Sequence, residues 1–301
     1  MPSTKEIKNH IKSVSETQKI TNAMYLIAST KLQKAKVELD KTRPFFEATK
    51  GEIKRIFRVD NKIDNKYFYP VEGDHDFKGD YGYLVITADK GLAGAYNQAV
   101  IKKSMELLKQ HSGKLYVVGE YGRQYFMQNN IPIEKTFLYT AQNPTIHRAR
   151  KISSILIDAY NKDEIKKIFI IYTDYVSGLV NNVCVDRLLP FHRAEFLSES
   201  HEQVVENFEF EPSINNVLNN IIPSYVVGFV YSALVDSFCS EQQSRMTAMD
   251  SANTNAQKLL DELDRQYNHT RQSDITREIT EISSGAKSLK QNSLKHKRSY
   301  N

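Results

Sequence analysis

The 301-residue sequence contains no tryptophan and only two cysteines. Its mean hydropathy is −0.51, and 26% of its residues are charged. A compact enzyme of this length buries a large share of its surface and needs many apolar side chains to do so. The composition therefore favours a protein with a high ratio of surface to core.

The two cysteines, Cys184 and Cys239, form no C-x-x-C pair, and neither lies near a cluster of histidines. We expect both to be small buried residues in a reducing compartment, without a structural disulfide. None of the eight histidines has metal-ligand spacing to another histidine or to a cysteine. The sequence therefore predicts no metal site.

Motifs for catalysis and phosphate binding are also missing, since the sequence has no G-x-S-x-G, no H-E-x-x-H and no G-x-x-x-x-G-K-[ST]. The segment Ala88–Asn97 carries Gly91 and Gly94 without the G-x-G-x-x-G spacing of dinucleotide-binding proteins, which favours a tight turn with close helix–sheet packing. Asp89 and Lys90 resemble an acid–base pair, but a capping and turn role is the better interpretation. We expect no active site and no cofactor.

Long apolar runs are absent too. The longest, Ile221–Val235, has 15 residues and includes Pro223 and two serines, whereas a membrane span needs about 20 apolar residues. The first residues are polar and helical in pattern, so we expect no signal peptide. The expectation is a protein that is cytosolic or peripheral to a membrane.

A long helical repeat occupies the C-terminal end. Between Cys239 and Leu289 there is no proline and the only glycine is Gly285. Apolar or small residues recur at steps of three or four, which is helical periodicity. They are Met249, Ala252, Ala256, Leu259, Leu263 and Tyr267, then Ile275, Ile279, Ile282, Ala286 and Leu289. The pattern predicts a helix over 213–289 that spans about 110 Å and therefore needs a long partner.

The N-terminal segment supplies that partner. Its apolar positions are separated alternately by four and three residues, a 3.5-residue repeat typical of a left-handed coiled coil. They are Ile7, Ile11, Val14, Tyr25, Ala28, Leu32, Ala35 and Leu39, and the same repeat includes two polar positions, Gln18 and Thr21. We predict a helix over 1–58 that forms an antiparallel hairpin with the C-terminal helix. The alternative is that the two helices bind separate partners.

The charges of the two ends are opposite. Residues 1–58 carry 13 Lys and Arg against 6 Asp and Glu, a net charge of +7. Residues 236–289 carry 6 against 9, a net charge of −3, and the basic tail 290–301 adds four positive residues. Opposite net signs favour pairing of the two arms.

The middle of the chain alternates between strand and helix patterns. After a polar linker over 59–80, strands are predicted at Tyr81–Asp89, Leu115–Glu120, Lys166–Val176 and Asn181–Pro190. Helices are predicted between the first and second strands and between the second and third. The prediction is a central α/β domain, Rossmann-like and doubly wound with a mostly parallel sheet, over 81–200. A loop over 201–212 follows it, where acidic and aromatic residues alternate.

Three segments resemble the gamma subunit of F-type ATP synthase: Ile11–Ala35, Thr87–Asn97 and Ser240–Leu289. The resemblance covers nearly the whole chain in the expected order. It implies a non-catalytic rotor subunit whose two terminal helices form the central stalk inside a ring of three alpha and three beta subunits. It further implies contacts with the epsilon subunit and the membrane ring of c subunits, at the cytoplasmic face of a bacterial cell membrane.

The resemblance also implies residue roles. Phe208, Glu209, Phe210, Glu211 and Pro212 would form the foot against the c ring. Leu259, Leu263, Ile279 and Ile282 are interpreted as residues of the coiled-coil seam. The contacts with the catalytic subunits would include Met24, Arg245, Arg271, Gln272, Thr276 and Glu278.

Two other classes remain as alternatives. A nucleotide-binding α/β enzyme with helical oligomerisation arms predicts stoichiometric nucleotide binding by the isolated chain. A basic coiled-coil protein that binds nucleic acid is suggested by the +7 arm alone, which has few aromatic side chains to stack on bases. We expect no nucleic acid partner.

Overall fold

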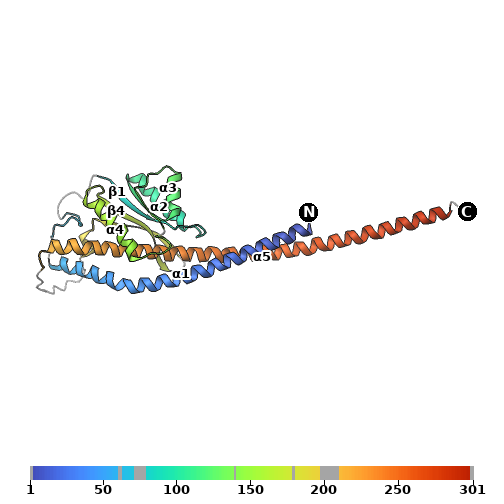
Figure 1. The fold of residues 1–301 in the computed structure, drawn as a ribbon, viewed down its shortest axis with the longest axis horizontal. Coiled ribbons are helices and arrows are strands. Elements are labelled where there is room, and N and C mark those ends of the chain that lie inside the picture. Colours follow the sequence, from blue (N-terminus) through green and yellow to red (C-terminus); the bar gives the residue numbers. More distant parts are fainter. Residues whose placement is uncertain are drawn as a thin grey trace. The chain divides into compact units, whose positions relative to one another are not determined.

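The computed structural model describes residues 3–59, 63–70, 79–138, 140–177, 180–196 and 210–298. The chain divides into two compact units. Unit 1 comprises Met1–Tyr25 and Met249–Asn301, and unit 2 comprises Leu26–Ala248. Each of the two long helices at the ends of the chain contributes to both units (Figure 1).

Both long helices predicted from the sequence are present. Helix α1 spans Thr4–Val59 with Pro44 inside it, so the helical pattern continues past that proline. Helix α5 spans Ile214–Arg298, which is 85 residues with Pro223 near its start. The segment 290–298, predicted as part of a separate basic tail, is thus helical.

In unit 1, α1 and the C-terminal part of α5 pack in antiparallel directions. The Thr21 hydroxyl donates to the Asn253 side chain, and the Gln18 amide donates to Gln257 Oε1 at 3.2 Å. Lower numbers on α1 therefore meet higher numbers on α5. These polar seam positions, which weaken an apolar zipper, bond to polar residues across the seam.

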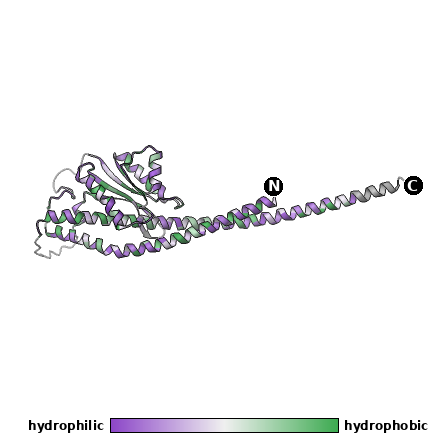
Figure 2. Cartoon of the chain, viewed as in Figure 1, coloured by the Kyte–Doolittle hydropathy of each residue, from purple (hydrophilic) through white to green (hydrophobic). Residues whose placement is uncertain are grey.

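The 3.5-residue repeat of α1 corresponds to its less exposed face in both units. Ile7, Ala28, Leu32 and Ala35 are buried, and the other predicted seam residues with a described side chain are half-buried. The ion pairs described on α1, such as Lys41–Glu38 and Arg55–Glu52, lie within that helix. The seam therefore consists mainly of apolar and hydrogen-bonding side chains. Figure 2 shows hydrophobic and hydrophilic residues alternating along both helices.

Unit 2 contains a five-stranded sheet with the strand order β3-β2-β1-β4-β5. The strands are β1 (Tyr81–Ile86), β2 (Gly113–Val118), β3 (Lys135–Phe137), β4 (Lys167–Ser177) and β5 (Val180–Leu189). All neighbouring pairs are parallel except β4–β5. The mostly parallel sheet is confirmed. Strand β3 was not predicted, because three residues are too few to establish a period of two.

Helices cover both faces of the sheet, as a doubly wound arrangement requires. They are α2 (Tyr96–Gln110), α3 (Glu120–Gln128) and α4 (Ile146–Asn161), together with α1 and α5. A short 3₁₀ helix, Arg193–Glu195, follows β5.

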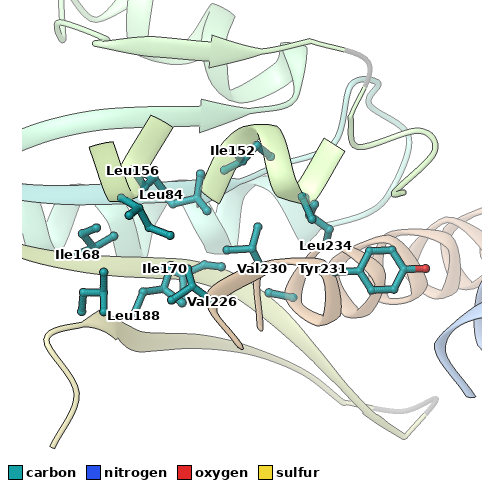
Figure 3. Close-up of a cluster of buried hydrophobic side chains, with 14 of the residues drawn as sticks. Leu84, Ile152, Leu156, Ile168, Ile170, Leu188, Val226, Val230, Tyr231 and Leu234 are labelled. Carbon is teal, nitrogen blue, oxygen red and sulfur yellow. The ribbon is translucent and has the colours of Figure 1, made fainter. Parts of the chain in front are cut away.

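Alternation along the strands produces two separate cores. Leu84 and Ile86 of β1 point to the face covered by α4, α5 and α1, while Tyr83 and Val85 point to the face covered by α2 and α3. On the first face, side chains of α5 pack directly on those of β1 and β4 (Figure 3). They include Val226, Val230 and Leu234 against Leu84, Ile168 and Ile170.

Of the described helices, α5 over Ile214–Lys287 is long and apolar enough to cross a membrane, with an 18-residue window of mean hydropathy 1.5. The sequence analysis missed this window because it ended the apolar stretch at Val235 and did not average hydropathy over 18 residues. In the structure 56% of the window is buried, and the core helix of a soluble protein meets the same criteria. The finding is weak evidence for a span.

A close contact between α1 and α5 in unit 2 yields a first prediction. A Cβ added at Gly228 would collide with the ring of Phe46, whereas one added at Gly51 would meet nothing within 4 Å. We expect Gly228→Ala to lower the free energy of unfolding by about 1–3 kcal/mol through overpacking. Gly51→Ala, the matched control in a helix, is expected to raise it by about 0.5–1 kcal/mol.

Chemical denaturation of the full chain measures both values. Gly228→Ala combined with Phe46→Leu should recover part of the loss, because the smaller side chain leaves room for the new methyl group. A Gly228→Ala variant as stable as the wild type would contradict the packing of Phe46 on this glycine.

Candidate functional site

The segment of α5 from Arg271 to Glu278 carries four of the six predicted contact residues. Arg271, Gln272, Thr276 and Glu278 are all exposed. The Thr276 hydroxyl donates to the Gln272 carbonyl at 2.8 Å, a bond within the helix. Among the described residues no ion pair is formed by Arg271 or Glu278. Their charged ends are thus available to another protein.

The exposure of this segment follows from the unequal lengths of the two helices in unit 1. Helix α1 begins at Thr4, and Gln18 pairs with Gln257. In an antiparallel pair with this register, α1 runs out of residues at about position 270 of α5, since both helices rise equally per residue. Beyond that point α5 has no partner within the described part of the chain.

The interpretation of Ile279 and Ile282 as seam residues is therefore wrong for this chain. They are 62% and 72% exposed, and Ile275 is 47% exposed. Leu263 is buried, as predicted, whereas Leu259 is 38% exposed and only borders the seam. The apolar repeat of α5 continues past the end of α1, so the turns from Ile275 to Ile282 present an exposed apolar stripe beside Arg271 and Glu278.

The other two predicted contact residues lie in different surroundings. Met24 is half-buried in unit 1. Arg245 lies in unit 2 and is engaged within the chain: its Nη1 is 2.6 Å from Glu241 Oε1, and its Nη2 donates to the Gly91 carbonyl at 3.1 Å. The structure therefore groups four of the six residues on one exposed segment. Arg245 lies elsewhere and is bonded to residues of its own chain.

The predicted foot is described only in part. Phe208 and Glu209 lie outside the described residues. Phe210 is half-buried and packs against the main core of unit 2, while Glu211 and Pro212 are exposed immediately before α5.

The turn between β1 and α2 has the geometry expected of a tight connection. Leu92 and Gly94 adopt positive φ angles of 61° and 55°. Asp89 Oδ1 accepts from the backbone N–H of Glu120 at 3.0 Å, at the N-terminus of α3. The predicted capping role of Asp89 is confirmed, and the helix it caps is α3.

The chain was compared with known proteins. A family model described as ATP synthase matches residues 3–289. The ATP synthase gamma chain of Acetivibrio thermocellus is 42% identical over 292 residues, covering 95% of this chain and 98% of that protein. The chain belongs to the ATP synthase gamma-chain family. Another gamma chain, the sodium-ion-specific one of Acetobacterium woodii, is 33% identical over 300 residues, covering 94% and 98% of the two chains.

Solved structures share the fold of this chain. A chain of the Euglena gracilis mitochondrial ATP synthase has a TM-score of 0.67 at 14% identity, covering 95% of this chain and 94% of that one. A chain of the Tetrahymena thermophila central stalk and c ring has a TM-score of 0.60 at 23% identity, covering 77% and 99%. As a gamma chain, the protein is a subunit of a larger complex.

The thiols of Cys184 and Cys239 are free, and burial raises the pKa of Cys239 to about 12. Of the residues described, no three His, Cys, Asp or Glu side chains form a group able to hold a metal ion.

Sequence reasoning missed a group of charged residues in this gamma chain, in unit 2 between α1, β4 and α5. Arg43, Asp174 and Asp236 line a cavity of about 340 Å³. The Ser232 hydroxyl donates to Asp236 Oδ2 at 3.3 Å. Burial and the neighbouring Asp174 carboxylate raise the pKa of Asp236 to about 7, against the opposing effects of Ser232 and Arg43. No motif marks this group, because its members come from three distant segments.

The raised pKa of Asp236 yields a prediction on stability. Between about pH 4 and pH 7 the folded chain keeps a proton that the unfolded chain releases, so this contribution is complete below pH 4 and is lost as the pH rises through 7. Asp236→Asn removes the titrating group. We therefore expect the Tm of Asp236→Asn minus that of the wild type to be larger at pH 8 than at pH 5.

Thermal unfolding of the full chain at the two pH values measures this difference. Asp250→Asn, at an exposed position on the same helix, is the control for loss of a negative charge. An equal difference in Tm at both pH values would contradict the buried, proton-binding state of Asp236.

Proposed function

We propose that this chain is the central rotor of an F-type ATP synthase and couples ion flow to ATP synthesis without performing chemistry itself. Catalysis belongs to the beta subunits in this proposal. The observation that carries it, beyond family membership, is the exposed end of α5, where Arg271, Gln272, Thr276 and Glu278 stand beside Ile275 and Ile279. A stripe that combines exposed apolar and charged side chains is typical of a surface that another protein covers.

The partners in this proposal are three alpha and three beta subunits around one copy of the chain, the epsilon subunit, and the c ring beneath the foot at 208–212. The complex lies at the cytoplasmic face of a bacterial cell membrane, and the chain is peripheral to that membrane. The half-buried Phe210 and the exposed Glu211 and Pro212 support a foot anchored in the core of unit 2.

The proposed mechanism follows from asymmetry. Three chemically identical catalytic sites around one shaft meet three different surfaces of it, so each site's open–closed equilibrium is biased by the surface it contacts. Shifting the ratio of open to closed sites from 1:99 to 99:1 requires contacts that favour one state over the other by about 5.5 kcal/mol. Hydrogen bonds to charged groups contribute about 1.5–3 kcal/mol each, so two to four contacts of the Arg271 and Glu278 type reach this value.

Reconstitution with alpha and beta subunits tests the proposal. One copy of the chain per three alpha–beta pairs is expected to restore multi-site ATP hydrolysis. An alpha–beta ring that assembles and turns over equally well without the chain would overturn the rotor function. Stoichiometric binding of ATP or a dinucleotide by the isolated chain would instead support a nucleotide-binding α/β enzyme.

The exposed segment yields a sharper prediction. Arg271→Ala and Glu278→Ala are each expected to lower coupled turnover at least about tenfold, since loss of about 1.5 kcal/mol or more of differential contact changes a rate by that factor. The free energy of unfolding of the chain should change by less than about 0.5 kcal/mol, because both side chains are exposed.

Arg277→Ala is the matched control. Arg277 is 71% exposed in the same segment and pairs with Asp274 and Glu281 within the helix, at 3.5 and 3.9 Å. Its loss should leave coupled turnover near the wild-type value. Gross unfolding after Arg271→Ala or Glu278→Ala would show that these residues stabilise the helix pair and are not partner contacts.

A further inference from the structure

A polar stripe on α5 faces the sheet of unit 2. It consists of Ser237, Ser240, Glu241 and Arg245, which are spaced so that they share one face of the helix. Ser237 Oγ accepts from the Thr173 backbone N–H at 3.3 Å, and Ser240 Oγ donates to the Thr173 carbonyl at 3.4 Å. These bonds attach α5 to strand β4. The remaining two residues, Glu241 and Arg245, attach α5 to the turn between β1 and α2.

Arg245 connects α5 to the turn between β1 and α2. Its Nη2 donates to the Gly91 carbonyl at 3.1 Å, while its Nη1 pairs with Glu241 Oε1 at 2.6 Å. The side chains are only 11% and 8% exposed. A buried guanidinium keeps its geometry only when a partner compensates its charge, so Glu241 holds Arg245 in the position from which it reaches the turn.

The turn is held by its own hydrogen bonds. The bond from Arg245 to Gly91 therefore fixes the position of the whole turn. The Ala88 N–H donates to Asn97 Oδ1 at 2.9 Å, and Asp89 caps α3. Tyr96, the first residue of α2, is buried, so the start of α2 is also packed in place. If residues 89–94 moved relative to α5, the N-terminal ends of α2 and α3 would therefore move with them.

Electrostatics place Arg245 at the centre of this arrangement. Asp89 Oδ2 is buried without a hydrogen-bond partner in the described part of the chain. Burial and the Asp89 carboxylate both raise the pKa of Glu241, whereas Arg245 lowers it. Loss of the guanidinium would leave the buried Glu241 and the half-buried Asp89, two acidic groups that interact unfavourably, without a positive charge between α5 and the turn. Such a junction is expected to open.

We propose that Glu241 and Arg245 form a clamp, and act as positioning residues, that fixes the turn 89–94 on α5 so that the sheet domain and the helix rotate as one body. This inference rests on the proposed rotor function. Arg245 lies three residues before the end of unit 2 at Ala248. Its effect on coupling therefore arises within the chain, through Gly91, and not through direct contact with a catalytic subunit.

The test uses the reconstituted complex with Glu241→Gln, Arg245→Ala and the double variant. The measured quantity is ion pumping per ATP hydrolysed. Each single variant is expected to lower this ratio about fivefold, and the double variant no further, because the two residues act as a unit. Arg245→Lys, which keeps the charge opposite Glu241, should restore at least half of the wild-type ratio.

A second readout is independent of rotation. Amide hydrogen exchange of residues 89–96 in the isolated full chain should be about tenfold faster in Glu241→Gln and Arg245→Ala than in the wild type. Exchange in β1 and β4 should stay unchanged and so exclude general unfolding. If the β strands also exchange faster in these variants, the exchange of Arg245→Lys is compared with that of the wild type. A smaller acceleration, confined to residues 89–96, is then expected.

Three outcomes would overturn the clamp. The first is normal coupling in Glu241→Gln together with a defect in Arg245→Ala, which would assign Arg245 to an external contact. The second is an additive double variant, and the third is unchanged exchange at 89–96. Failure of the wild-type chain to restore multi-site hydrolysis is a different result, because it rejects the rotor function while the exchange measurement still decides the clamp.

Discussion

The burial of one face of α5 against the sheet is the interaction on which the rest of the structure depends. Val226, Val230 and Leu234 pack on Leu84 and on strand β4, and α1 packs on the neighbouring surface of the same helix. A helix of 85 residues is far longer than any stretch that unit 2 can cover. The same helix therefore belongs to a globular core at one end and to a two-helix pair at the other, without a linker between them.

Most of the fold follows from two periodicities in the sequence. The 3.5-residue repeat of α1 identifies the residues that are buried or half-buried, and alternation along β1, β2 and β4 matches the two faces of the sheet. Both patterns result from the geometry of a single element, so they are visible without knowledge of its neighbours. Strand β3 and the helical continuation through 290–298 carry too weak a local pattern to be predicted.

The site was predictable only where it depended on one helix. The exposed positions of Arg271 and Glu278 on α5 agree with an interpretation as contact residues, which the structure itself does not test. The exposure of Ile279 depends on where α1 begins relative to α5, and the pairing of Arg245 depends on which turn lies beside it. Both are properties of the register between distant segments, which no spacing within a segment can reveal.

The difference in length between α1 and α5 has a mechanical consequence. Two helices packed side by side resist bending and twisting much more than one, because bending the pair must stretch one helix while compressing the other. From about residue 270 onward α5 is single within the described chain, and it carries both Arg271 and Glu278 there. Elastic deformation of α5 is therefore concentrated in the unpaired segment, which carries the residues proposed as partner contacts, while the part paired with α1 stays stiff.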